Sequence, residues 1–103
     1  MIAGVRFHQQ RVAGTVLLPA SKSISNRYLL LRSLAGSDAE IANLSEARDT
    51  RLLQELLNSA TTVLDAQDAG TVYRFLTAML AYKPGKWQLT GTLRMQERPV
   101  GAL

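Results

Sequence analysis

Near the start of the chain, residues 21–27 read Ser-Lys-Ser-Ile-Ser-Asn-Arg and bring together three groups that can bind an anion. If this segment is helical, Ser23 and Arg27 share one face. Lys22 then falls in the first turn, where free N–H groups and the positive end of the helix dipole favour an anion. The spacing predicts a phosphate-binding or carboxylate-binding site. The alternative is that the serines only cap the helix while Lys22 and Arg27 lie in solvent.

A second group with the same chemistry surrounds Gly70. Glycine lets a ligand approach the main chain closely. Thr71 and the N–H groups that follow it could donate to an anion at the start of a helix, and Arg74 lies one turn further. The alternative is an ordinary turn in which Asp68 or Thr71 caps the helix.

A third group places Arg94 and Arg98 around a single acid, Glu97. The planar guanidinium suits carboxylates and phosphates because it can form two parallel hydrogen bonds with them. Glu97 could hold one of the two arginines in place, and a helix is expected to begin near Pro99. These residues add cations to a site for anions.

The apolar pattern predicts an α/β arrangement of the elements that must position these groups. Helices are expected from Ile24 to a stop at Gly36, around the leucines of 52–57 with Ser45 or Asp49 as the cap, and over 72–82. The first helix should pack through Ile24, Tyr28, Leu31 and Ala35. Strands are expected at 14–18, where Pro19 ends the run, and at 39–44, 61–64 and 87–90.

Composition narrows the classes of function. The 103 residues contain no cysteine and one histidine, so disulfides are excluded and a metal site is not expected. No apolar run is long enough to cross a membrane, and a cytoplasmic protein is expected. The net charge of +4 comes from two basic segments around an acidic middle. Because its basic residues do not alternate with stacking aromatics, a nucleic-acid-binding module is the weaker alternative.

Taken together, the three groups resemble one family. Residues 18–27 read Leu-Pro-x-Ser-Lys-Ser-x-Ser-Asn-Arg, residues 68–74 read x-Ala-Gly-Thr-x-x-Arg, and residues 89–101 read Leu-Thr-Gly-x-x-Arg-Met-x-Glu-Arg-Pro-x-Gly. In this order they are similar to the N-terminal part of the enolpyruvylshikimate-phosphate synthases, also called 3-phosphoshikimate 1-carboxyvinyltransferases. A rival resemblance is to the sister transferase that acts on UDP-N-acetylglucosamine.

The resemblance implies a function in the shikimate pathway of aromatic amino-acid biosynthesis. The family transfers the enolpyruvyl group of phosphoenolpyruvate to the 5-hydroxyl of shikimate 3-phosphate and uses no cofactor. Lys22 would contact both substrates, Ser23 and Arg27 would bind shikimate 3-phosphate, and Gly70 and Arg98 would bind phosphoenolpyruvate. The remaining cations and the hydroxyl would support them: Thr71, Arg74 and Arg94.

The resemblance also implies an architecture. The family builds two domains from βαβαββ units, forming an inside-out α/β barrel, and residues 1–103 would be a partial domain covering the first quarter. Residues 1–18 would pair with the other domain and 19–103 would form a substrate-binding α/β unit. The chain alone would then be inactive, with an unpaired edge open to self-association. Departures at Ala20, Asp68 and Phe75 would bear on substrate affinity.

Overall fold

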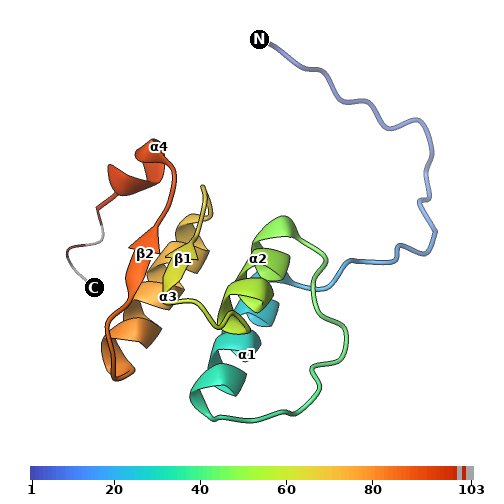
Figure 1. Cartoon of the computed structure of the whole chain (residues 1–103). Coiled ribbons are helices and arrows are strands. Elements are labelled where there is room, and N and C mark those ends of the chain that lie inside the picture. Colours follow the sequence, from blue (N-terminus) through green and yellow to red (C-terminus); the bar gives the residue numbers. More distant parts are fainter. Residues whose placement is uncertain (100, 102–103) are drawn as a thin grey trace.

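The computed structural model describes residues 1–99 and residue 101. It is a mixed α/β structure, and in Figure 1 its helices and strands all follow the long blue N-terminal segment. In chain order the elements are α1 (Lys22–Leu34), α2 (Arg48–Leu57), β1 (Val63–Asp65), α3 (Gly70–Tyr82), β2 (Gln88–Thr90) and α4 (Leu93–Gln96). The predicted helices at 24–35, 52–57 and 72–82 are confirmed, each with an earlier start.

Helix α1 begins two residues before Ile24 and ends before the predicted stop at Gly36. The hydroxyl of Ser21 accepts a hydrogen bond from the backbone N–H of Ile24 at 3.2 Å, which satisfies one of the free donors of the first turn. At the other end Gly36 has a φ of 59°, and the next N–H, from Ser37, bonds back to the carbonyl of Arg32. A left-handed glycine at this position stops the helix.

The face that α1 turns inward differs from the predicted one. Its buried residues are Ser25, Asn26 and Leu29, whereas Ile24, Tyr28 and Leu31 are each more than half exposed. The apolar stripe therefore points outward. Ser25 fits the interior because its hydroxyl accepts a hydrogen bond of 2.9 Å from the N–H of Ser45.

The core lies where α1, α2, α3 and the sheet meet. Its largest fully enclosed apolar side chains are Leu29 of α1, Leu53 of α2, and Val72 and Leu76 of α3, joined by Leu64 from β1. The leucine stripe of α2 thus packs as predicted. Neither predicted cap of this helix is correct, because Ala47 precedes α2 and no side chain accepts there.

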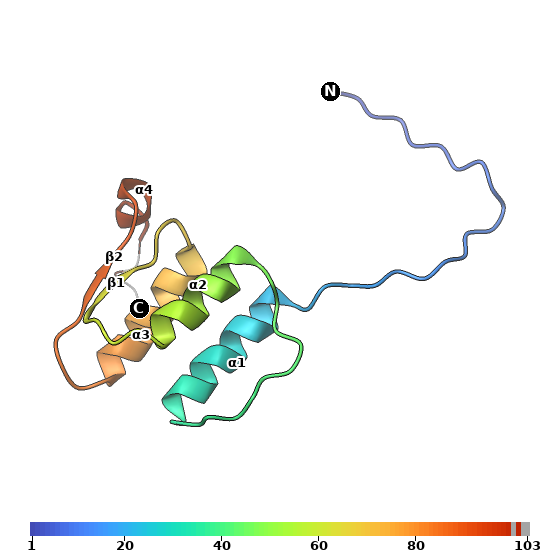
Figure 2. The same cartoon turned by 45° about the vertical axis from the view of Figure 1, so that its right-hand side comes forward.

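The two strands pair in parallel, with Val63 opposite Gln88 and Asp65 opposite Thr90. Helix α3 makes the crossover between them, so 63–90 forms one βαβ unit. α3 lies behind the strands in Figure 1 and beside them in Figure 2, and it therefore covers one face of the sheet. Parallel pairing puts both carboxyl ends at the same edge of the sheet. The predicted strands at 61–64 and 87–90 are thereby confirmed. The first starts two residues and ends one residue later than predicted, and the second starts one residue later.

The other two predicted strands are absent from the described residues. Residues 39–44 form a loop that includes a turn at 42–43, with Asn43 at a φ of 56°. Residues 14–18 belong to a long segment without helix or strand that runs away from the packed part in both views (Figures 1 and 2). A strand needs a hydrogen-bonding neighbour, and neither segment has one in this structure.

The extended N-terminal segment makes the molecule longer than a compact domain of this size. The principal extents are 62 × 38 × 21 Å, and the radius of gyration is 18.6 Å, above the ~13 Å typical of a compact domain of this length. Helix α4 was not predicted, and the expected helix start near Pro99 reaches into residues outside the described set. Within that set, none of the helices has the length and apolar character needed to span a membrane.

Candidate functional site

The N-terminal ends of α1 and α3 face a common depression of about 260 Å³. Five of the eight residues singled out from the sequence line it: Lys22, Ser23, Arg27, Thr71 and Arg74. They come from segments almost fifty residues apart, which the packing of α1 against α3 brings together. Two helix N-termini and three cations make this depression suited to an anion.

On the α1 side, the predicted sharing of a face by Ser23 and Arg27 is confirmed. The guanidinium of Arg27 donates to the backbone carbonyl of Ser23 at 3.1 Å and also to the Ser23 hydroxyl. These contacts fold the arginine back over the first turn of its own helix. One ligand could therefore meet the hydroxyl and the guanidinium together.

Lys22 is tied to the second helix. Its Nζ donates to Oδ2 of Asp49 in the first turn of α2 at 3.2 Å, and about half of the lysine side chain is exposed. An ion pair this exposed contributes little stability, so the ammonium can turn to a ligand at small cost. Asp49 thus orients Lys22 at the rim of the depression.

On the α3 side, Gly70 lies directly beneath two guanidinium groups. A Cβ atom at Gly70 would overlap Nη1 of Arg98 and lie 3.2 Å from Nη1 of Arg74. The backbone N–H groups of the first turn of α3 therefore share this space with two cations. A side chain at this position would push the end of the Arg98 side chain aside.

The sheet explains why Arg98 reaches Gly70. The segments that follow β1 and β2 leave the same edge, and the N–H of Thr92 donates to the carbonyl of Gln67 at 3.0 Å. Thr92 then caps α4 by accepting from the N–H of Met95, and the chain continues to Arg98. Arg94 lies exposed on α4 and does not line the depression, so the structure does not bring it to the other predicted residues.

The two departures near Gly70 can now be placed. Asp68 does not leave an unbalanced negative charge, because Nη2 of Arg48 donates to its Oδ1 at 2.9 Å. Phe75 lines the depression beside Arg74 and packs against the core, so it forms part of the wall. Both residues leave the N-terminus of α3 accessible.

Besides Phe75, one polar lining residue was not predicted as a site residue. Asn26 is fully buried, lines the depression, and neither oxygen nor nitrogen of its carboxamide has a hydrogen-bond partner. A buried polar group without a partner costs about 1–3 kcal/mol. The only signal in the sequence was its place directly before Arg27, within the first motif.

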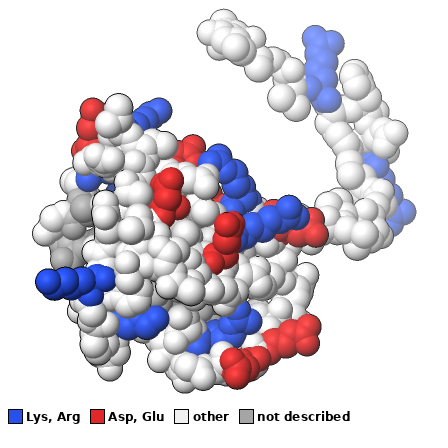
Figure 3. Space-filling view, in the orientation of Figure 1, with Lys and Arg blue, Asp and Glu red and all other residues white. Residues whose placement is uncertain are grey.

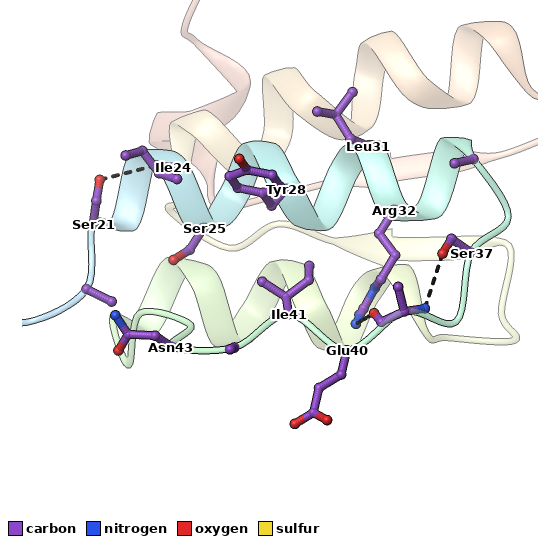
Figure 4. A pocket seen from close by; sticks show the side chains of 14 residues that line it. Ser21, Ile24, Ser25, Tyr28, Leu31, Arg32, Ser37, Glu40, Ile41 and Asn43 are labelled. Carbon is purple, nitrogen blue, oxygen red and sulfur yellow. Dashed lines mark hydrogen bonds between the residues drawn. The ribbon is translucent and has the colours of Figure 1, made fainter.

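A larger hollow lies on the opposite side of α1 and has a different character. It measures about 720 Å³ and lies between the outward face of α1 and residues 37–43. Figure 4 shows Ile24, Tyr28, Leu31 and Ile41 along it, with Arg32 crossing toward the loop, where it donates to the carbonyl of Ala39. It contains none of the predicted substrate-binding residues. Size therefore does not identify the site.

Charge is distributed differently over the two parts of the molecule. Figure 3 shows acidic and basic side chains interspersed over the packed part, whereas residues 1–20 carry only basic ones. Among the residues that the structure describes, no group of three or more histidine, cysteine, aspartate or glutamate residues could hold a metal ion. The candidate site is therefore described by its cations, hydroxyls and amide groups.

Comparisons with known proteins all point to one family. The family model of EPSP synthase (3-phosphoshikimate 1-carboxyvinyltransferase) matches residues 7–59 and 52–103. A Bacteroides fragilis protein named 3-phosphoshikimate 1-carboxyvinyltransferase is 45% identical over 93 residues, covering 90% of this chain and 23% of the relative. Proteins of the same name from Nitrosomonas europaea and Pseudoalteromonas translucida are 39% and 42% identical, with 93% and 90% of this chain and 28% of each relative covered.

The chain thus spans about a quarter of the length of the curated relatives it matches. The alignment to the Nitrosomonas protein runs over 120 positions, more than the 103 residues of this chain, so that relative carries residues within the matched region that are absent here. No solved structure matches the chain.

Proposed function

Since the chain belongs to the EPSP synthase family, we propose that its depression between α1 and α3 binds the substrates of that reaction, shikimate 3-phosphate and phosphoenolpyruvate. The reaction is transfer of the enolpyruvyl group from phosphoenolpyruvate to the 5-hydroxyl of shikimate 3-phosphate. One observation carries the proposal: five residues of two separate sequence motifs line a single depression.

The proposal divides the site between the two helices. Ser23 and Arg27 bind shikimate 3-phosphate, since hydroxyl and guanidinium already face one point on α1. Gly70 and Arg98 bind phosphoenolpyruvate, since the guanidinium lies against the first turn of α3. Lys22 lies at the α1 end of the depression and contacts both.

The supporting residues extend the positive charge around these contacts. Thr71 offers a hydroxyl, and Arg74 lies between the Gly70 turn and the α1 residues. Arg94 acts from the next helix, α4. Holding two anions together in one place requires several fixed cations, which offset the repulsion between the substrates and position them for reaction.

Binding does not amount to catalysis. The groups in the depression are cations, hydroxyls and amides, and none of the acidic residues of the chain lines it. We therefore propose that this chain supplies substrate-binding residues and does not carry out the transfer by itself. A cytoplasmic location is proposed from the family alone.

The proposal extends to architecture. The β1, α3 and β2 unit would be part of a βαβαββ repeat in the inside-out barrel of the family, and residues 1–18 would pair with a second domain. Support for the latter comes from the exposed apolar side chains of Val16, Leu17 and Leu18 and from the absence of a neighbouring strand beside these described residues. The unpaired segment would promote self-association.

Calorimetric titration of shikimate 3-phosphate into the chain at low salt tests the site. A Lys22→Ala, Arg27→Ala double variant should lose saturable binding. A control with Arg32→Ala and Arg51→Ala removes the same charge from residues that do not line the depression, and it should bind normally. If both double variants lost binding equally, the loss would be due to the lower net charge of the chain, and this would contradict the proposed site.

A further inference from the structure

Asn26 stands out among the residues of the depression because its polar groups have no use within the protein. Its side chain is fully buried, and both Oδ1 and Nδ2 lack hydrogen-bond partners. Buried carboxamides are nearly always satisfied by protein or water, so each exception calls for a physical reason. A ligand that fills the depression would supply one.

The position of Asn26 on α1 allows contact with such a ligand. It follows Lys22 by four residues and Ser23 by three, so it lies one turn below both on the same side of α1. Thr71 and Arg74 of α3 line the same depression. Asn26 therefore lines the same space between the two helix N-termini as these residues do.

The chemistry of the carboxamide differs from that of its neighbours. Lysine and arginine side chains only donate hydrogen bonds, whereas asparagine donates through Nδ2 and accepts through Oδ1. Inorganic phosphate, most of whose oxygens only accept, would depend mainly on the donor. A ligand with a hydroxyl next to its anionic group would use both atoms.

We propose that Asn26 is a ligand-contacting residue that adapts this depression to a hydroxylated phosphate monoester. Nδ2 donates to an anionic oxygen of the ligand, and Oδ1 accepts from a ligand hydroxyl. This inference rests on the proposed function, and it adds to that function the residue that distinguishes such an ester from inorganic phosphate.

The test uses the full chain with shikimate 3-phosphate and inorganic phosphate as probes. Asn26→Leu keeps the side-chain size and removes both polar atoms, and it should weaken binding of shikimate 3-phosphate about tenfold, the effect of losing hydrogen bonds worth about 1.4 kcal/mol. Its binding of inorganic phosphate should fall less. The melting temperature of the free variant should rise, because an unpartnered buried group is gone.

Thr50 supplies a matched control. Its hydroxyl is also buried without a partner, but Thr50 does not line the depression. Thr50→Val should raise the melting temperature and leave both affinities unchanged. A purely structural role for Asn26 would instead lower the melting temperature of Asn26→Leu and affect both probes equally, which would overturn the inference.

A measurement on the unaltered chain covers the case in which Asn26→Leu does not fold. The side-chain NH₂ signals of Asn26 in a ¹⁵N spectrum should shift on saturation with shikimate 3-phosphate, and unchanged signals would refute the contact. If the folded wild-type chain binds no shikimate 3-phosphate, both this inference and the proposed function fail. If Arg27→Ala abolishes binding while Asn26→Leu retains it, only the inference about Asn26 fails.

Discussion

About half of the residues in each of the stretches 1–20 and 22–97 are apolar, yet only the second stretch packs into a core. The first stretch exposes Phe7, Val12, Leu17 and Leu18, each at least 64%, while the second encloses Leu29, Leu53 and Leu76 completely. The difference lies in backbone hydrogen bonding. A helix satisfies its own N–H and C=O groups, whereas an extended segment needs a neighbouring strand before its side chains can be buried.

The comparison predicts the largest effect in the core. Leu53→Ala should lower the free energy of unfolding by about 2–5 kcal/mol, because it leaves a cavity among enclosed side chains. Val16→Ala, in a side chain that is 77% exposed, should change it by less than about 0.5 kcal/mol. Urea denaturation followed by circular dichroism measures both. A comparable loss in Val16→Ala would show that the N-terminal segment packs in solution.

A second prediction compares two glycines, one from each region. Gly70→Ala should weaken phosphoenolpyruvate binding at least about tenfold, or ~1.4 kcal/mol, because the new methyl group displaces Arg98 and crowds Arg74. Gly14→Ala meets no atom within 4 Å and should bind as the wild type does. Isothermal titration measures both affinities. Normal binding by a folded Gly70→Ala chain would remove Gly70 and Arg98 from the site.

A third prediction concerns the boundary between the two regions. Ser21→Ala removes the cap of α1 and should cost about 1 kcal/mol of unfolding free energy, whereas Ser21→Asp keeps an acceptor for the N–H of Ile24 and should cost little. Thermal unfolding of the two variants provides the measurement. Equal stability of both would mean that the start of α1 does not depend on this hydrogen bond.

The smallest expected change in stability follows from removing the N-terminal segment. The free energy of unfolding of a chain that begins at residue 19 should differ from that of the full chain by less than about 0.5 kcal/mol, because residues 1–18 contribute no described core residue. Its state of association should change instead. Light scattering at high concentration should give a mass above the monomer for the full chain and the monomer mass for the shortened one. A full chain that stays monomeric would contradict self-association through this segment.

The features that could be predicted from the sequence are those set by near neighbours along the chain. The cap at Ser21, the stop at Gly36 and the shared face of Ser23 and Arg27 all follow from spacings of four residues or fewer. The Gly70 turn at the start of α3 follows in the same way. These local rules were enough to select most of the residues that line the depression.

The features that could not be predicted depend on distant partners. The strands expected at 14–18 and 39–44 fail because pairing requires a neighbour that no local pattern specifies. The inward face of α1 was mistaken for the Ile24 and Tyr28 side, because an apolar stripe shows what can be buried and not what covers it. Asn26 escaped notice for the same reason, since its burial depends on α3.

The parallel pairing of β1 and β2 has a consequence for variation in chain length. The segments that leave the carboxyl ends of the strands lead to Gly70 at the start of α3 and to Arg98, whereas those at the amino ends, residues 58–62 and 83–87, hold no site residue. Lengthening a surface loop adds only a slowly growing entropy cost. The amino-end loops can therefore accept insertions or deletions while the anion-facing edge keeps its geometry, and they are the places to join or splice foreign segments in engineered versions of this chain.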